Sequence, residues 1–255
     1  MKKTVKVIIA ITASIAALAA ASCTKDDTIR YNNATMGNIV NGKFTSDQGN
    51  IFNVAEQTYP GKLDTMKRAF VICDILSEIP NTKNEYEVRL NYVTPVLTKD
   101  AIYTSSLTED NKLENDPIIL QSCWLSGGYL NIYLAVPIVS DSKIKHSLYF
   151  EYDDTEKTEG TYTFHIRHDA AGEEFNDTND DKIMLSYAYA SVPVASIIKE
   201  NNANVMIKWL SHRISGNTIM LNESIEQKLE AKYTKDSFQQ VPAEATASRA
   251  AFELR

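Results

Sequence analysis

The stretch from Tyr129 to Ile138 reads YLNIYLAVPI, and its hydrophobic residues recur at every second position. Leu130, Ile132, Leu134 and Val136 fall on one side of this pattern. Successive side chains of a β-strand point to opposite faces, so an alternation of period two is typical of a half-buried strand. The stretch therefore predicts a strand with one face against a core.

The same alternation recurs along most of the chain. It is present in EYEVRLNYV (85–93), in SLYFEYDD (147–154) and in TYTFHIRH (161–168). These segments are rich in tyrosine and β-branched residues, which are common in strands. We therefore predict an all-β protein, and the 44% of hydrophobic residues is sufficient for a buried core.

The segment SIEQKLEAKYT (224–234) fits two structures. Ile225, Leu229 and Tyr233 are four residues apart, as in a helix. A helix would also place Glu226 near Glu230, and Lys228 near Lys232, which is destabilising. A strand instead separates the hydrophobic residues from the charged ones, so we predict a strand.

Turn residues separate the predicted strands, for example at Asn41-Gly42 and Gly127-Gly128. The polar stretch from Thr104 to Pro117 has few hydrophobic residues, and we predict a domain boundary there. After Lys235 no period is evident, which predicts a mobile tail. The expected parts are a signal peptide (1–22), a lipidated tether (23–34), a barrel domain (35–104), a linker (105–117), a sandwich domain (118–235) and the tail (236–255).

The N-terminal residues have the parts of a secretory signal. Three lysines precede an uncharged apolar run from Val7 to about Ala21, which is short for a membrane-spanning helix. Small residues then precede Cys23 in LAAASCTKDD (18–27), and this resembles a bacterial lipobox, although Ala20 stands where leucine is usual. We therefore expect Cys23 to be acylated at the new N-terminus. An ordinary cleaved signal with an incidental cysteine is the alternative.

A short charged run follows this cysteine. Lys25, Asp26 and Asp27 resemble an export signal that sends some lipoproteins to the outer cell surface. Thr24 stands where an inner-membrane retention signal would have aspartate. We expect an outer-membrane lipoprotein, displayed at the surface; a solvated tether on a periplasm-facing protein is the alternative.

The net charge argues against one class of partner. Loss of residues 1–22 removes three lysines and no acidic residue, so the net charge changes from −7 to about −10. Nucleic-acid binding depends on neutralising phosphates with basic residues. We therefore expect no nucleic-acid partner and, apart from the lipid anchor, a glycan or a protein.

The two remaining cysteines, Cys73 and Cys123, lie in hydrophobic strand-like segments. An extracytoplasmic compartment would allow a disulfide between them. Buried free cysteine also packs as a small hydrophobic residue. We favour two unpaired cysteines in the core.

The best candidates for metal binding are one histidine pair and one acidic loop. On a strand, His165 and His168 point to opposite faces and cannot share an ion, so we interpret them as surface or edge histidines. The acidic residues from 169 to 181 carry oxygen ligands that calcium prefers, but their spacing does not match an EF-hand loop. We predict no metal; the acidic residues are Asp169, Glu173, Glu174, Asp177, Asp180 and Asp181.

Catalytic motifs are absent from the sequence. No G-x-S-x-G nucleophile elbow occurs, and the WLSGG stretch around Ser126 lacks its leading glycine. The nine glycines form no phosphate-binding loop. We predict no cofactor and no catalytic residue.

The order of segments resembles the NigD-like family of bacterial lipoproteins. The resemblance rests chiefly on GYLNI (128–132) and RHD (167–169), within a strand order that covers nearly the whole mature chain. It implies an N-terminal OB-type five-stranded barrel followed by a C-terminal antiparallel β-sandwich. The family takes its name from a bacteriocin-associated operon, and no activity is established for it.

The resulting expectation is a lipid-anchored, non-enzymatic envelope protein with a binding or interaction role. A carbohydrate-active hydrolase that uses two carboxylates is one alternative, because two acidic residues can meet in space without any sequence motif. A structural component of envelope assembly, joined through its edge strands, is the other.

Overall fold

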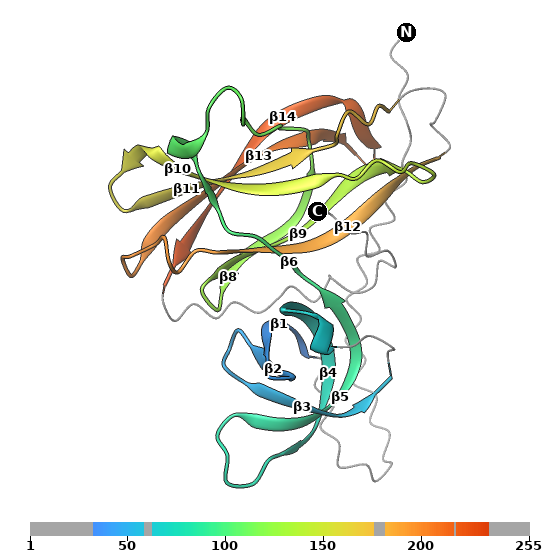
Figure 1. The fold of residues 1–255 in the computed structure, drawn as a ribbon, viewed down its shortest axis with the longest axis vertical. Coiled ribbons are helices and arrows are strands. Elements are labelled where there is room, and N and C mark those ends of the chain that lie inside the picture. Colours follow the sequence, from blue (N-terminus) through green and yellow to red (C-terminus); the bar gives the residue numbers. More distant parts are fainter. Residues whose placement is uncertain (1–32, 59–62, 176–181, 217, 235–255) are drawn as a thin grey trace.

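The structure, a computed structural model, describes residues 33–58, 63–175, 182–216 and 218–234. Strands and two 3-10 turns make up its regular structure, so the all-β prediction is confirmed. Figure 1 shows a small barrel formed by the N-terminal strands beside a larger sandwich formed by the rest. None of the described residues forms a helix long and apolar enough to cross a membrane.

The N-terminal domain is a closed barrel with the strand order β1-β2-β3-β5-β4, and β1 pairs with β4 to close it. The predicted OB-type five-stranded barrel is therefore confirmed. The predicted Asn41-Gly42 turn joins the first two strands with both residues at positive φ, 52° and 76°. The barrel elements are β1 (Asn33–Val40), β2 (Lys43–Ser46), β3 (Ile51–Gln57), the turn η1 (Leu63–Thr65), β4 (Arg68–Glu78) and β5 (Glu85–Pro95).

The C-terminal domain is a sandwich of two sheets, which confirms the second predicted fold. One sheet has the order β14-β13-β11-β10-β7, and the other has the order β6-β12-β9-β8. Most pairs are antiparallel, but β11–β13, β7–β10 and β6–β12 are parallel. The elements are β6 (Leu97–Thr98), β7 (Ile102–Tyr103), the turn η2 (Thr104–Ser106), β8 (Ile119–Ser126), β9 (Tyr129–Val139), β10 (Ser147–Thr158), β11 (Thr161–Asp169), β12 (Ile183–Pro193), β13 (Ala203–Ser215) and β14 (Thr218–Tyr233).

The alternation in the sequence matches the sandwich core. Leu130, Ile132 and Leu134 of β9 are fully buried between the two sheets. Strand β9 differs from the half-buried prediction in one respect, because Asn131 on its other face is also 0% exposed. That face lies against the barrel. The ambiguous segment 224–234 lies in β14, so the strand prediction is confirmed over residues 224–233.

The chain enters the sandwich earlier than predicted. Strands β6 and β7 already belong to its two sheets, so the chain leaves the barrel near Val96 and not at Thr104. The polar stretch expected as a linker runs along the sandwich. The Ser105 backbone N–H donates to Asp154 (2.8 Å), and the Asp116 N–H donates to the His168 carbonyl oxygen (2.8 Å). These polar bonds attach the stretch to the sandwich without a hydrophobic pattern, which is why its sequence resembles a linker.

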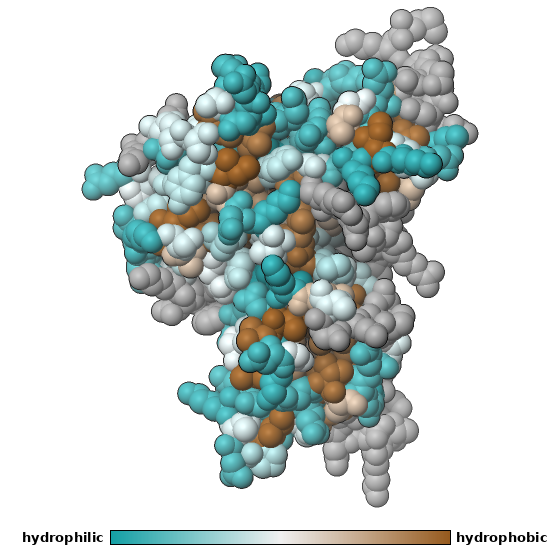
Figure 2. Space-filling model, in the orientation of Figure 1, coloured by the Kyte–Doolittle hydropathy of each residue, from teal (hydrophilic) through white to brown (hydrophobic). Residues whose placement is uncertain are grey.

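The two domains share an apolar contact. Phe70 of β4 stacks on Tyr189 of β12 with ring centroids 4.4 Å apart, and Met36, Trp124 and Tyr133 pack in the same cluster. Elsewhere, on the face drawn in Figure 2, hydrophobic residues form separate patches among hydrophilic ones. The barrel and the sandwich therefore meet through a common core.

The described cysteines are both free, as predicted. Cys73 is buried in the barrel core, and Cys123 packs against the sandwich core. Burial raises the pKa of each thiol to about 12, and for Cys73 the neighbouring Asp74 carboxylate adds to the effect. Neither thiol is therefore set up as a nucleophile.

Candidate functional site

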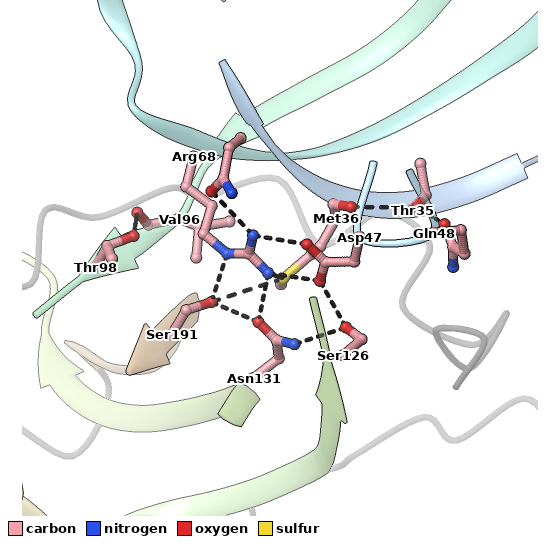
Figure 3. A network of polar contacts seen from close by, with 11 residues as sticks. Thr35, Met36, Asp47, Gln48, Arg68, Val96, Thr98, Ser126, Asn131 and Ser191 are labelled. Atoms are coloured by element: carbon pink, nitrogen blue, oxygen red, sulfur yellow. Dashed lines mark hydrogen bonds and ion pairs between the residues drawn. The ribbon is translucent and has the colours of Figure 1, made fainter. Parts of the chain in front are cut away.

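Among the described residues, a first buried polar cluster lies between the barrel and the sandwich (Figure 3). Its centre is Arg68 of β4, which is 2% exposed. Both Nη atoms of Arg68 donate to Asp47, at 2.8 and 2.7 Å. The remaining donations go to Asn38 (3.1 Å), Asn131 (2.8 Å) and Ser191 (3.0 Å). Because a guanidinium has five N–H groups, every donor of Arg68 is used.

The acceptors of this Arg68 cluster are also connected to one another. Ser126 donates to Asp47 (2.5 Å), Asn131 donates to Ser126 (2.9 Å), and Ser191 donates to Asn131 (2.6 Å). The Tyr129 ring lies 3.9 Å from the guanidinium carbon. A buried charge is tolerated when it is paired and fully hydrogen-bonded. Because the partners of Arg68 come from both the barrel and the sandwich, the cluster joins the two domains. It has no donor left for a ligand.

The second cluster lies at one end of the sandwich and consists of three histidines and a glutamate. His146, His168 and His212 are each 2–3% exposed, and the Glu173 side chain is 3% exposed. The His146 Nε2 atom lies 3.1 Å from Glu173 Oε2, and the His146 Nδ1 atom lies 3.1 Å from His168 Nε2. The Val139 backbone N–H also donates to Glu173 Oε2 (3.0 Å). We call these four side chains the histidine cluster.

The order of these contacts sets the histidine tautomers. A carboxylate can only accept hydrogen bonds, so with Glu173 ionised the proton of a neutral His146 lies on Nε2. The His146 Nδ1 atom is then an acceptor, and His168 donates to it through Nε2–H. In this tautomer the remaining nitrogen, His168 Nδ1, carries a lone pair and can accept a hydrogen bond. The assignment is inferred from the contacts with Glu173 and His146.

Three atoms of the histidine cluster have no partner with good hydrogen-bond geometry among the described residues. They are His168 Nδ1, His212 Nδ1 and Glu173 Oε1. Looser contacts with the backbone of Pro117, for His168, and of Leu221 and Met220, for His212, partly offset the lowering of the two histidine pKa values. Buried polar atoms without partners are rare in folded proteins and each calls for an explanation. All three residues line one pocket of about 380 Å³, which is formed by Asp116, Pro117, Pro137, His168, Ala170, Glu173, Glu174, Phe175, His212, Leu221 and Asn222.

The electrostatics of this pocket are acidic. Burial lowers the pKa of His168 to about 4, and the neighbouring His146 adds to the effect. Burial also lowers the pKa of His212 to about 4. Both imidazoles are therefore neutral near pH 7, while three carboxylic acids and no lysine or arginine line the described pocket. The arrangement offers hydrogen-bond acceptors and negative charge.

The predicted site residues are only partly within the described residues. Cys23, Lys25, Asp26 and Asp27 lie outside them, as do three acidic residues of the 169–181 loop (Asp177, Asp180 and Asp181). Within the described part of the chain, Glu173 and Glu174 reach the pocket, and no three His, Cys, Asp or Glu side chains are placed so that they could hold a metal ion.

The interpretation of the histidine pair is half correct. His165 and His168 do lie on opposite faces, since the His165 ring is within 4.0 Å of Asp153 while His168 is in the buried cluster. The assignment of His168 to the surface or an edge is wrong. His168 continues the inward series of Phe164 and Ile166, so the period-two pattern contained this signal.

A second pocket, of about 400 Å³, lies beside β11, β13 and β14. Trp209 and Asn115 line it, and Trp209 Nε1 and Asn115 Oδ1 have no partner among the described residues. Arg167, Lys208 and Lys228 give this pocket basic side chains. This pocket therefore combines an aromatic ring with basic side chains, whereas the pocket at the histidine cluster is acidic.

Comparison with known families assigns the sandwich. The model of the NigD-like C-terminal beta sandwich domain matches residues 101–233. The chain belongs to the NigD-like family. The matched range begins at Ala101, just before β7, in agreement with the early entry of the chain into the sandwich.

Solved structures share the fold of this NigD-like chain. One is a protein of unknown function from Bacteroides vulgatus, 18% identical, with a TM-score of 0.59 over 83% of this chain and 97% of that chain. Another is a NigD-like immunity protein from Bacteroides caccae, 19% identical, with a TM-score of 0.54 over 80% of this chain and 96% of that chain. A candidate lipoprotein from Bacteroides fragilis is 13% identical, with a TM-score of 0.55 over 80% and 98%. Comparison with curated proteins gave no match.

Proposed function

We propose that this chain is a non-enzymatic binding protein of the bacterial envelope, and that the pocket at the histidine cluster binds a basic group of a peptide or protein. The observation that carries the proposal is the set of three unpartnered polar atoms at one pocket. A ligand that donates hydrogen bonds would supply the missing partners, because unsatisfied buried polar groups cost free energy.

The chemistry of the pocket selects a cation. His168 Nδ1 and Glu173 Oε1 are acceptors when Glu173 is ionised, and Asp116 and Glu174 add carboxylates to the lining. An ammonium or guanidinium group has several N–H donors and a positive charge, so it complements such a lining. In a protein partner, lysine and arginine side chains have these properties.

A binding role agrees with the remaining features of the pocket. Its described lining contains no serine, threonine, cysteine or lysine, which are the usual hydroxyl, thiol and amine nucleophiles. A hydrolase that uses two carboxylates is the alternative activity. One of the similar structures is described as an immunity protein, which supports a role that depends on a partner.

A thermal-shift titration tests the pocket. The probes are N-acetyl-arginine amide and N-acetyl-lysine amide, with the neutral N-acetyl-citrulline amide as the matched control. Binding to the folded state raises the melting temperature by mass action, so we expect a rise with the two cations only. Glu173→Gln should abolish the rise, whereas Glu78→Gln, on the exposed end of β4, should keep it. An equal response to citrulline amide, or none to either cation, would refute the proposal.

A glycan is the second candidate ligand, at the pocket beside Trp209. An indole ring with an unpartnered N–H, an unpartnered amide oxygen and several charged side chains suits a sugar with hydroxyl groups. A glycan array with the wild type and Trp209→Ala tests it. Binding that the substitution removes supports this candidate, and release of reducing sugar would instead indicate the hydrolase.

We further propose that acylated Cys23 anchors the protein to the outer membrane, with Lys25, Asp26 and Asp27 directing it to the cell surface. The lipobox-like residues before Cys23 support this. Two or more acyl chains hold a protein stably on a membrane. Cys23→Ser should move the protein to the soluble fraction or leave it unprocessed, and it should remove label from radioactive palmitate.

The export part of the proposal has a separate test. Changing Lys25, Asp26 and Asp27 together to alanine should keep the protein in the membrane fraction but protect it from protease added to whole cells. A labelled wild-type protein that protease cannot reach would refute surface display alone. The acidic chain supports a glycan or protein partner in the envelope over nucleic acid.

A further inference from the structure

The outer edge of β14 is a regular strand edge without a neighbour among the described strands. Residues Ile225–Tyr233 pair with Ala203–Ser211 of β13 without interruption, and the only irregularity of this pair lies earlier in β14. An edge strand presents unpaired N–H and C=O groups that can pair with another chain. Nine regular residues are enough for a strand-to-strand contact.

The charges on this edge alternate in sign. Glu226, Lys228, Glu230 and Lys232 are all exposed and lie on one face of β14. None of the four forms an ion pair with another described residue. Across the β13–β14 pair, Lys228 faces Lys208, which places like charges opposite each other. Among the described residues, these four charges therefore have no ion-pair partner on a neighbouring strand.

We propose that β14 is a dimer interface, at which β14 of a second copy of this chain pairs antiparallel with Leu229 facing Leu229 on the twofold axis. In this register Lys228 of each chain faces Glu230 of the other, and Glu226 faces Lys232. The contact is isologous, so each of these pairs occurs twice. Moving the axis to Lys228 or Glu230 would instead bring like charges together. An axis at Gln227 or Ala231 would form two pairs of opposite charges, whereas the axis at Leu229 forms four, so the charge sequence favours the Leu229 register.

The hydrophobic residues of the edge fit the same register. Leu229 is 40% exposed and Ile225 is 48% exposed, although both lie on the face of the sheet that carries the core. Across the proposed axis, Leu229 meets its own copy and Ile225 faces Tyr233. The second copy would cover exposed apolar surface that nothing among the described residues covers. A dimer goes beyond the ligand proposed for the histidine cluster, whose pocket uses β14 only at Leu221 and Asn222. The pocket beside Trp209 shares Glu226, Gln227 and Lys228 with the proposed interface, so the dimer and the second candidate ligand would compete.

Disulfide trapping of the full-length protein in intact cells tests the register. Directly opposed residues of antiparallel strands have Cα atoms about 4.5–5.5 Å apart, within the range of a disulfide. Leu229→Cys should therefore give a band of twice the mass on non-reducing gels after mild oxidation. Gln227→Cys is the matched control, because each Gln227 faces Ala231 and the introduced thiols would be far apart. Co-expression of Gln227→Cys with Ala231→Cys should restore the band.

The native thiols do not interfere within the described residues, since Cys73 and Cys123 are free and packed in the two cores. If Leu229→Cys and the mixed pair stay monomeric, or if Gln227→Cys alone dimerises equally, the proposal is wrong. A band of another mass would identify a different protein as the occupant and would also overturn it.

Charge exchange then tests what selects the partner. In the Leu229→Cys background, Lys228→Glu places two pairs of like charges across the axis and should reduce the trapped fraction about tenfold. Glu230→Lys should do the same. The double variant Lys228→Glu/Glu230→Lys restores opposite charges and should recover the wild-type level. Equal trapping in all four proteins would show that the charges do not set the contact.

Discussion

The two buried polar clusters differ in how completely their hydrogen bonds are satisfied. In the Arg68 cluster, each N–H of the guanidinium has an acceptor, and Asp47, Asn131 and Ser191 are further bonded to Ser126 or to one another. In the histidine cluster, three atoms on His168, His212 and Glu173 have no partner among the described residues. Both clusters are almost completely removed from water.

This difference separates a structural cluster from a binding cluster. A satisfied buried network contributes to stability and fixes how two elements pack. A buried network with unpartnered atoms lowers the stability of the folded protein unless a ligand supplies the missing hydrogen bonds. Functional sites often carry such a cost in stability. The Arg68 cluster therefore holds the two domains together, and the histidine cluster is the place for a ligand.

The largest expected effect comes from breaking the Arg68 cluster. Arg68→Met leaves the Asp47 carboxylate buried without its cation, and removal of one partner of a buried pair costs about 3–5 kcal/mol. Denaturant unfolding measures the loss. The control is Arg213→Gln, whose pair with Glu223 is exposed and should contribute about 0–1 kcal/mol. Equal losses in the two variants would contradict a structural role for Arg68.

The histidine cluster should instead make stability depend on acid. His168 and His212 have pKa values of about 4 in the folded protein, and unfolded histidine has a pKa of about 6.5. Between these values the unfolded chain binds more protons, so stability falls as the pH decreases from 6.5 toward 4. At pH 5 the loss is about 2 kcal/mol for each histidine.

Unfolding in denaturant at pH 8 and pH 5 measures this loss. The double variant His168→Gln/His212→Gln should remove most of the difference between the two pH values. An unchanged difference in that variant would show that other groups cause the acid sensitivity.

The sequence predicted the fold better than the site. The alternation of hydrophobic residues shows which face of a strand a side chain lies on, but it does not show which other side chain that residue contacts. Segments such as 129–138 showed which residues face a core, and the strand at 224–233 followed from its charges. Extending the alternation to His146 and His168 would have placed both inside, since they continue the inward series of Leu148 and Phe164. His212 could not be found in this way, because it lies at a register shift between β13 and β14.

The Arg68 cluster could not be predicted from the sequence at all. Arg68 precedes a hydrophobic run and Asp47 lies in a turn signal, so each has an ordinary local explanation. Their partners Ser126, Asn131 and Ser191 come from a different domain. Pairing across domains leaves no periodic trace in a single sequence.

A smaller effect tests how tightly the Arg68 cluster is packed. Gly127 and Gly42 both have positive φ, 57° and 76°. A Cβ atom at Gly127 would lie 2.5 Å from Asp47 Oδ1, whereas at Gly42 it would meet nothing within 4 Å. Gly42→Ala should cost about 1 kcal/mol for its backbone alone. Gly127→Ala should cost roughly 1–2 kcal/mol more, because Asp47 must move away from Arg68. Equal costs in denaturant unfolding would mean that Asp47 can shift freely.

The smallest expected effect comes from the same substitution, serine to alanine, at two buried positions. It tests whether the loss of a hydrogen-bonded polar group costs more than the loss of an unpartnered one. Ser191 and Ser186 are 0% and 1% exposed, but the Ser191 hydroxyl accepts from Arg68 and donates to Asn131, while the Ser186 hydroxyl has no partner among the described residues. Ser191→Ala leaves a buried N–H unsatisfied and should cost about 1 kcal/mol. Ser186→Ala removes a group that is already unsatisfied, so its free energy of unfolding should stay within about 0.5 kcal/mol of the wild type or rise slightly. If both substitutions cost the same, missing partners would carry no information about function, and the assignment of the histidine cluster as a binding site would lose its physical basis.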